Sequence, residues 1–132
     1  MHFREGKKAV LVEIERTLDR VNPEAVERMV QFLLDARTVF IAAAGRSGLM
    51  IRSFAMRLGH LGRSVQVVGD VTTRGIGAGD VLLVASGSGE TRGILAMAQS
   101  AVENRGKVRV ITIFPESSLT KLAACREVSR QL

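Results

Sequence analysis

Residues 81–91 read VLLVASGSGET, and this stretch decides the fold class. Its first half, Val81–Ala85, is a continuous apolar run of the kind expected for a strand buried on both faces of a sheet. Its second half is a polar loop with two glycines, and a helical pattern follows it over residues 90–104. A strand, a tight loop and a helix in this order predict one unit of a parallel α/β sheet.

The same alternation repeats along the rest of the chain. Between the apolar runs lie stretches with helical spacing, which favours right-handed βαβ units and a three-layer doubly wound sheet of four or five parallel strands. The further runs are 38–43, 65–68 and 108–114, with a fifth strand expected at 127–130, and the other helical stretches are 47–61 and 117–124.

The first 37 residues predict a helical lead. Val10, Ile14 and Leu18 recur at helical spacing. Asn22 suits a helix N-cap, and Pro23 suits the first helical position that follows it. We therefore expect one domain over residues 1–132, with a helical lead at 1–37 and a βαβ core at 38–132. The segment 69–80 has no helical pattern, and we expect a loop near the site.

Composition limits the functional classes. The net charge is +6, from 19 basic and 13 acidic residues, but the basic residues are scattered, which favours a solvated surface over a nucleic-acid site. The single cysteine, Cys125, cannot form an internal disulfide, and its apolar neighbours favour a packing role. No apolar stretch approaches the ~18 residues of a membrane span, and the N-terminus lacks a signal-peptide pattern. We expect a cytoplasmic protein with neither nucleic-acid nor membrane partners.

Two loops carry the chemistry. Gly45–Gly48 (GRSG) follows the first strand, and Ser86–Thr91 (SGSGET) follows the third. Each precedes a helix, whose first N–H groups and positive dipole end bind anions. In the flavodoxin-like strand order the first and third strands are neighbours at the switch point, where ligands bind. Hydroxyl-rich loops that converge there predict a site for a phosphate ester with a polyhydroxyl tail.

A dinucleotide site is the alternative interpretation of the glycines. Gly87, Gly89 and Gly93 give a GxGxxxG spacing, one residue longer than the dinucleotide fingerprint, and they follow the third strand rather than the first. Asp70 does end the second strand, where a ribose-binding acid would lie. The spacing and the hydroxyls favour a phosphosugar.

Four motifs together resemble the SIS (sugar isomerase) family, and within it the 6-phospho-3-hexuloisomerases. They are GRSG (45–48), FAMRLGHLG (54–62), VVGDVTT (67–73) and SGSGET (86–91). The resemblance covers residues 38–132 and implies interconversion of 3-hexulose 6-phosphate and fructose 6-phosphate in carbohydrate metabolism such as formaldehyde fixation. It also implies that no metal or organic cofactor takes part, and that the chain forms a homodimer or homotetramer.

The resemblance assigns expected roles to individual residues. It implies phosphate binding at the Ser86–Thr91 loop and sugar contacts at the Gly45 loop and after the second strand. Arg74 stands where this family more usually has a proline. The expected binding residues are Gly45, Arg46, Ser47, Thr72, Thr73, Ser86, Gly87, Ser88, Gly89 and Thr91.

The base that would move the proton is less well defined. Glu90 is expected to open the helix after the phosphate loop, where a carboxylate that only stabilises the helix dipole is an equal alternative. His60 matches the family pattern, but helical rise puts it about 20 Å from Ser47, so it could act only across a subunit interface. The family continues into a segment with a Phe-Glu pair that this chain does not contain. Another SIS isomerase and a non-catalytic sugar-phosphate sensor therefore remain alternatives.

Overall fold

The structure is a computed structural model that describes residues 2–124. The expected strand at 127–130 and Cys125 lie outside the described residues. The elements in chain order are α1 (Phe3–Asp19), α2 (Pro23–Asp35), β1 (Val39–Ala43), α3 (Gly45–His60), β2 (Val65–Val67), β3 (Val81–Ala85), α4 (Arg92–Glu103), β4 (Lys107–Ile111) and α5 (Ser118–Ala124).

The described strands form a four-stranded, all-parallel sheet in the order β2-β1-β3-β4. β1 and β3 are neighbours, as the sequence predicts, and their registers run from Val39 opposite Val81 to Ala43 opposite Ala85. Apolar side chains point to both faces of β1 and β3, which explains why their sequences are continuous apolar runs rather than alternating ones.

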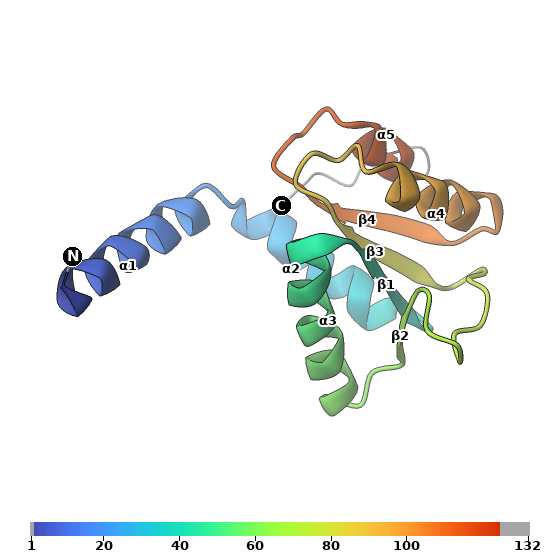
Figure 1. The fold of residues 1–132 in the computed structure, drawn as a ribbon. Helices are drawn as coiled ribbons and strands as arrows, with labels where there is room; N and C mark the ends of the chain where they lie inside the picture. The colour runs from blue at the N-terminus through green and yellow to red at the C-terminus, as the bar shows by residue number, and fades with distance from the viewer. Residues whose placement is uncertain (1, 125–132) are drawn as a thin grey trace.

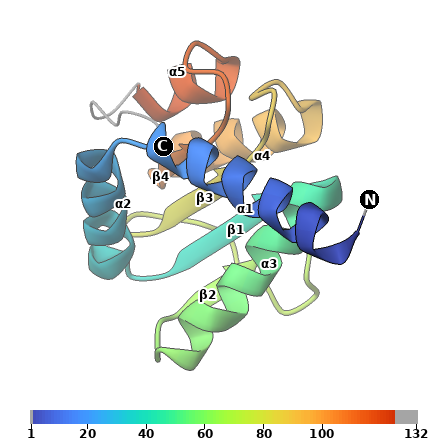
Figure 2. The same cartoon turned by 90° about the vertical axis from the view of Figure 1, so that its left-hand side faces the viewer.

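Helices cover both faces of the sheet, which confirms the three-layer prediction (Figures 1 and 2). On one face Leu33 of α2 and Ile51 of α3 pack against the sheet. On the other face Ile94 of α4 and Leu119 of α5 do so. The chain after β1 therefore goes to one face, and the chain after β3 goes to the other.

Three predicted boundaries are wrong by two or three residues. α3 begins at Gly45 and not at Ser47, so the predicted Gly45–Gly48 loop is already helical. β4 ends at Ile111, not at Phe114, because Thr112 and Ile113 turn toward the Ser86–Thr91 loop. The Thr112 hydroxyl and the Ile113 N–H both donate to the carbonyl of Gly87, at 3.2 and 3.3 Å. α4 begins at Arg92, so Glu90 lies in the loop and does not open the helix.

The helical lead consists of two unequal helices. Asn22 caps α2 as predicted, since its side chain accepts the N–H groups of Glu24 and Ala25 at 2.9 and 3.3 Å. α1 differs from α2 because it extends away from the sheet, and none of its 17 described residues is buried (Figure 1). Over residues 2–124, no helix has the length and apolar character needed to cross a membrane.

The connection from β2 to β3, residues 68–80, crosses the sheet as a loop without a helix. It is fastened at the amino ends of the strands by Asp80, whose carboxylate is fully buried. Arg74 donates to both carboxylate oxygens at 2.8 and 2.9 Å, and Arg37 does so at 3.1 and 3.2 Å. The Gly77 N–H adds a bond of 2.8 Å. Burial alone would raise the pKa of Asp80, but these donors together hold that pKa far below its ordinary value.

Candidate functional site

The two predicted loops start from paired residues at the carboxyl edge of the sheet. Ala43 and Ala85 are register partners, and the Gly45 loop and the Ser86 loop follow them directly. Because α3 and α4 then pack on opposite faces, the segments that follow these two neighbouring strands diverge here, at the switch point where doubly wound sheets bind their ligands. The structure thus brings the two loops together.

Hydroxyl groups organise the Ser86–Thr91 loop from within. The buried Ser86 hydroxyl lies 3.0 Å from the Thr91 hydroxyl and accepts the N–H of Gly89 at 3.0 Å. The exposed Ser88 hydroxyl accepts the N–H of Glu90 at 3.1 Å. Each hydroxyl can both donate and accept, so Ser88 and Thr91 retain capacity for a ligand oxygen.

Gly89 fixes the path of this loop for two reasons. Its φ is +68°, in the left-handed region that glycine tolerates without strain. A Cβ at this position would lie 2.1 Å from the Ser117 hydroxyl oxygen and 2.3 Å from the Ser117 Cβ. The loop therefore packs directly against the connection between β4 and α5, and only glycine fits there.

The amino end of α4 offers backbone N–H groups. Thr91 is its N-cap residue, but within the described chain the Thr91 side chain makes no capping hydrogen bond to the helix. Its hydroxyl is instead directed to Ser86. The first N–H groups of α4 therefore combine with the positive end of the helix dipole, an arrangement that favours a phosphate or another anion.

The Gly45–Gly48 loop forms the first turn of α3. Gly48 is buried against β1, where an added Cβ would lie 3.1 Å from the Ala43 carbonyl oxygen, so glycine allows the close approach of helix to strand. Gly45 has a φ of +59°, which lets the chain turn sharply from β1 into the helix. Arg46 is exposed and Ser47 is half-buried at this end of the helix.

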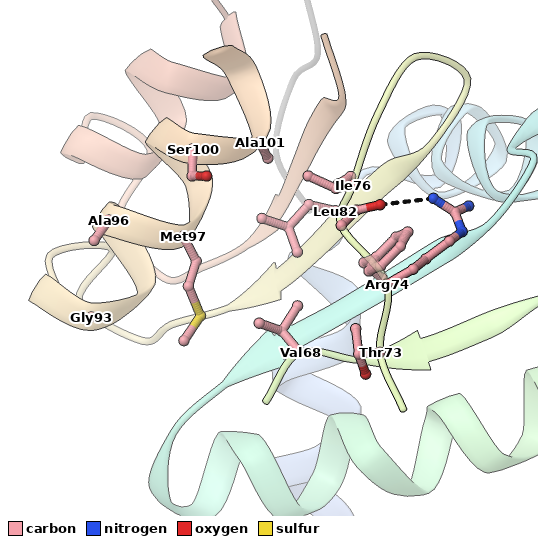
Figure 3. A pocket seen from close by; sticks show the side chains of 12 residues that line it. Val68, Thr73, Arg74, Ile76, Leu82, Gly93, Ala96, Met97, Ser100 and Ala101 are labelled. Carbon is pink, nitrogen blue, oxygen red and sulfur yellow. Dashed lines mark hydrogen bonds between the residues drawn. The ribbon is translucent and has the colours of Figure 1, made fainter. Parts of the chain in front are cut away.

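The loop after β2 places Thr72 and Thr73 differently. Thr72 is exposed, whereas the half-buried Thr73 donates its hydroxyl hydrogen to the Val67 carbonyl at 2.6 Å. Thr73 also lines a cavity of about 460 Å³ that extends along α4 from Gly93 (Figure 3). Phe40 and Met97 contribute to the mainly apolar wall.

This cavity was not predicted from the sequence. Figure 3 shows side chains from α4 on one side and from the loop after β2 on the other. It forms because the connection from β2 to β3 has no helix over this part of the sheet. Its described lining includes no hydroxyl from the Ser86–Thr91 loop, so the cavity lies beside the predicted phosphate position and does not coincide with it.

Glu90 is held by a contact that sequence reasoning missed. Its carboxylate accepts the backbone N–H of Ser118, at the start of α5, at 2.8 Å. Hydrogen bonding from Ser118, first from its side chain and then from its backbone N–H, lowers the pKa of Glu90, and the positive charge of Lys121 acts in the same direction. A lowered pKa makes the carboxylate a weaker base. No sequence pattern connects residues 90 and 118, because the contact depends on how β4 places α5.

His60 lies at the other end of α3 from the Gly45 loop. It is the last residue of the helix and is exposed. The helical rise from residue 47 to residue 60 gives the separation of about 20 Å expected from the sequence. The structure therefore does not bring His60 to the two loops within one copy of the chain. Over residues 2–124, no group of three His, Cys, Asp or Glu side chains is placed to hold a metal ion.

A family model described as the SIS domain matches residues 32–128, which includes both loops. This chain belongs to the SIS domain family. Among curated relatives, this SIS domain is 45% identical over 111 residues to the 3-hexulose-6-phosphate isomerase of Mycobacterium gastri. It is 39% identical over 114 residues to the protein of the same name from Bacillus subtilis (strain 168). These matches cover 84% and 86% of this chain but only 56% and 62% of the two relatives.

Solved structures give the same picture of the SIS domain. One crystal structure of a hypothetical protein matches with a TM-score of 0.84 at 38% identity, over 89% of this chain and 62% of that one. A second hypothetical protein, from Methanococcus jannaschii, matches with a TM-score of 0.67 at 32% identity, over 76% of this chain and 56% of that one. The structure of the latter is described as inferring the function of a 3-hexulose-6-phosphate isomerase.

Proposed function

We propose that this SIS domain binds a ketohexose 6-phosphate and serves an isomerase that interconverts 3-hexulose 6-phosphate and fructose 6-phosphate through an enediol. The observation that carries the proposal is the Ser86–Thr91 loop, with its hydroxyls and the start of α4, beside the Gly45 loop at the switch point. The names of the relatives with 39–45% identity support the choice of sugar.

In this proposal the phosphate binds at the start of α4. The N–H groups of the first helical turn and the hydroxyls of Ser88 and Thr91 would donate to its oxygens. The sugar would extend toward the Gly45 loop, where Arg46 could polarise the carbonyl and stabilise the developing negative charge on oxygen. Gly87 and Gly89 would let the backbone approach the phosphate closely.

The reaction itself moves one carbon-bound proton. A base would remove the proton from C2 of the 3-ketose, the enediolate would form between C2 and C3, and a proton would return at C3 as the carbonyl forms at C2. We propose Glu90 or His60 of a second copy as the base. The hydrogen bond of Glu90 to Ser118 does not favour Glu90, and the position of His60 requires an adjacent subunit.

The hydrogen bond between Glu90 and Ser118 favours a second candidate function, a sugar-phosphate sensor without catalytic activity. A domain in which the carboxylate of this loop is held at the start of α5 could bind a sugar phosphate without isomerising it. Binding and turnover are therefore tested separately. An isomerase acting on arabinose 5-phosphate or sedoheptulose 7-phosphate is distinguished from the main proposal by the sugar that binds most tightly.

Calorimetry with fructose 6-phosphate tests the binding proposal. Replacing the two exposed hydroxyls, Ser88→Ala with Thr91→Ala, should weaken binding by about 1–3 kcal/mol, because charge-assisted hydrogen bonds to the phosphate are lost. Ser53→Ala is the matched control, since the exposed hydroxyl of Ser53 donates within its own helix to the Leu49 carbonyl. Equal affinity in the double variant and the control would remove the loop from the site.

A coupled assay for formation of fructose 6-phosphate tests catalysis. Loss of a positioned general base should lower turnover by about 10²–10⁴-fold. The assay is run on the unaltered chain, on Glu90→Gln and on His60→Ala. A large loss in one variant identifies that residue as the base, and unchanged turnover in both excludes the two. Tight binding with no turnover in the unaltered chain would support the sensor instead.

We also propose that the domain works as a homodimer or homotetramer and binds no nucleic acid. Apolar side chains remain exposed on the outer sides of α2 and α3, including Val30, Leu34, Met50 and Phe54. A second copy that covers them would remove apolar surface from water, and soluble assemblies of this kind are mostly closed and symmetric. Light scattering that gives the mass of a monomer at all accessible concentrations would contradict this part of the proposal.

A further inference from the structure

The surface of α1 is amphipathic and lacks a partner within the described chain. Leu11, Ile14 and Leu18 are 49–63% exposed, and Phe3 is 84% exposed. These residues recur at helical spacing and form one stripe along the helix, in which Lys7 also lies. Helices in proteins owe most of their stability to packing of an apolar face, so contacts beyond the described residues would stabilise α1.

The charges beside this stripe are divided between the two ends of the helix. Arg4 and Lys8 lie on one flank near the amino end, and Glu15 and Asp19 lie on the same flank near the carboxyl end. Successive residues of this set are four, seven and four positions apart, close to one or two helical turns, so all four lie on the same flank. All of these residues also line one shallow hollow along α1, together with Leu11, Ile14 and Leu18.

Because this flank is basic at one end and acidic at the other, it can form opposite-charge contacts with the same flank of a second copy. In an antiparallel pair of identical helices about a twofold axis, the basic end of each helix meets the acidic end of the other. Position 4 of one copy then faces position 19 of the other, and position 8 faces position 15. One twofold axis produces both contacts, because both pairs are centred between residues 11 and 12. The apolar stripes face each other between them.

We propose that two copies of the chain pair through α1 in an antiparallel arrangement. Arg4 lies beside Asp19 of the partner subunit, and Lys8 lies beside Glu15 of the partner subunit. The apolar stripe supplies most of the affinity, and the four charge contacts set the direction and the register. The inference rests on the assembly proposed above, but not on isomerase activity.

Charge reversal followed by charge exchange tests the pairing by sedimentation velocity over a concentration series. Arg4→Glu with Lys8→Glu places like charges at both ends and should raise the dimer dissociation constant about tenfold or more. Adding Glu15→Lys and Asp19→Lys to the same chain restores opposite charges and should restore the dimer. Arg16→Glu with Arg20→Glu, which reverses two basic residues away from the stripe, is the matched control and should leave the dimer intact.

Cross-linking determines the direction of the pair. In a Cys125→Ser background, Lys8→Cys with Glu15→Cys should give covalent dimers with a short thiol-reactive linker, whereas Lys8→Cys alone should not. Covalent dimers from Lys8→Cys alone would overturn the antiparallel arrangement.

Other outcomes separate this inference from the proposals above. A monomeric unaltered chain would overturn both the pairing and the assembly. An oligomer that is insensitive to the charge variants would overturn only the pairing. Binding of α1 to vesicles containing phosphatidylglycerol, with loss of that binding in Arg4→Glu/Lys8→Glu and no dimer in solution, would assign the stripe to a membrane surface and overturn the inference.

Discussion

Polar side chains lie at both ends of the sheet, but the carboxylate at one end is buried and fully hydrogen-bonded, whereas two hydroxyls at the other are exposed. At the amino ends of the strands, the buried carboxylate of Asp80 accepts hydrogen bonds from Arg37, Arg74 and Gly77. At the carboxyl ends, the exposed hydroxyls of Ser88 and Thr91 each make one hydrogen bond to the described residues. A saturated cluster of charges contributes to stability, whereas hydroxyls with remaining capacity beside a helix start are available to a ligand.

We therefore expect substitutions at the two ends of the sheet to affect different properties, stability at one end and ligand affinity at the other. Changes at the amino ends should cost stability and leave ligand affinity intact in the folded protein. Changes to the exposed side chains of the Ser86–Thr91 loop should cost affinity and little stability. Gly89 is the expected exception, because the backbone of that loop is packed as tightly as a core position.

The largest effect is expected at Gly89. Gly89→Ala should lower the free energy of unfolding by about 3 kcal/mol, because the new Cβ meets Ser117 and an alanine at positive φ is strained. Urea unfolding measures the change. Gly93→Ala is the control: it lies in α4 with open space around its Cβ position and should stabilise the helix by up to about 1 kcal/mol. Similar values for the two variants would show that Gly89 is not constrained.

A smaller loss is expected at Asp80. Asp80→Asn should lower the free energy of unfolding by about 2 kcal/mol, since both arginines lose a buried anionic partner but are exposed enough to regain water. Asp70→Asn is the control, because its ion pair with Arg52 is exposed and long at 3.8 Å. Fructose 6-phosphate affinity measured below the unfolding transition should remain unchanged, and a large loss of affinity would refute the separation of the two ends.

The smallest effect is a loss of stability in acid. The pKa of Asp80 is lowered in the folded chain, so its contribution is fully present above the unfolded pKa of about 3.9 and is lost as the pH falls toward the folded value. Near pH 3 this loss should be about 1 kcal/mol. Urea unfolding at neutral pH and near pH 3 gives the difference, which should be smaller in Asp80→Asn. An equal acid loss in both proteins would assign it to other carboxylates.

The strands and the first cap were predictable because their signals are local. Continuous apolar runs place β1 and β3 correctly, and Asn22 before Pro23 gives the start of α2. The two loops were predictable for the same reason, because each follows its strand directly in the sequence. Their proximity follows from the strand order, which the alternation of strands and helices indicates.

The remaining features depend on contacts between distant residues. Asp80 meets Arg37 across 43 positions, and nothing in their local sequence distinguishes them from charges on a solvated surface. Glu90 was expected at a helix start, but α4 begins two residues later and the carboxylate reaches Ser118. The cavity beside α4 likewise depends on a loop replacing a helix between β2 and β3, and its apolar side chains are the same types that fill a core.

The exposure of α1 has a consequence for hydrogen exchange. β1 is bonded to a strand on each side, so its amides exchange only when the domain opens globally, at a rate independent of protein concentration. No residue of α1 is buried within the described chain, so without a covering partner its amides exchange at nearly the rate of an unfolded segment. When a second copy covers α1, this exchange slows as the protein is concentrated. A single deuterium-labelling series therefore reports the stability of the sheet through β1 and the occupancy of the helix contact through α1.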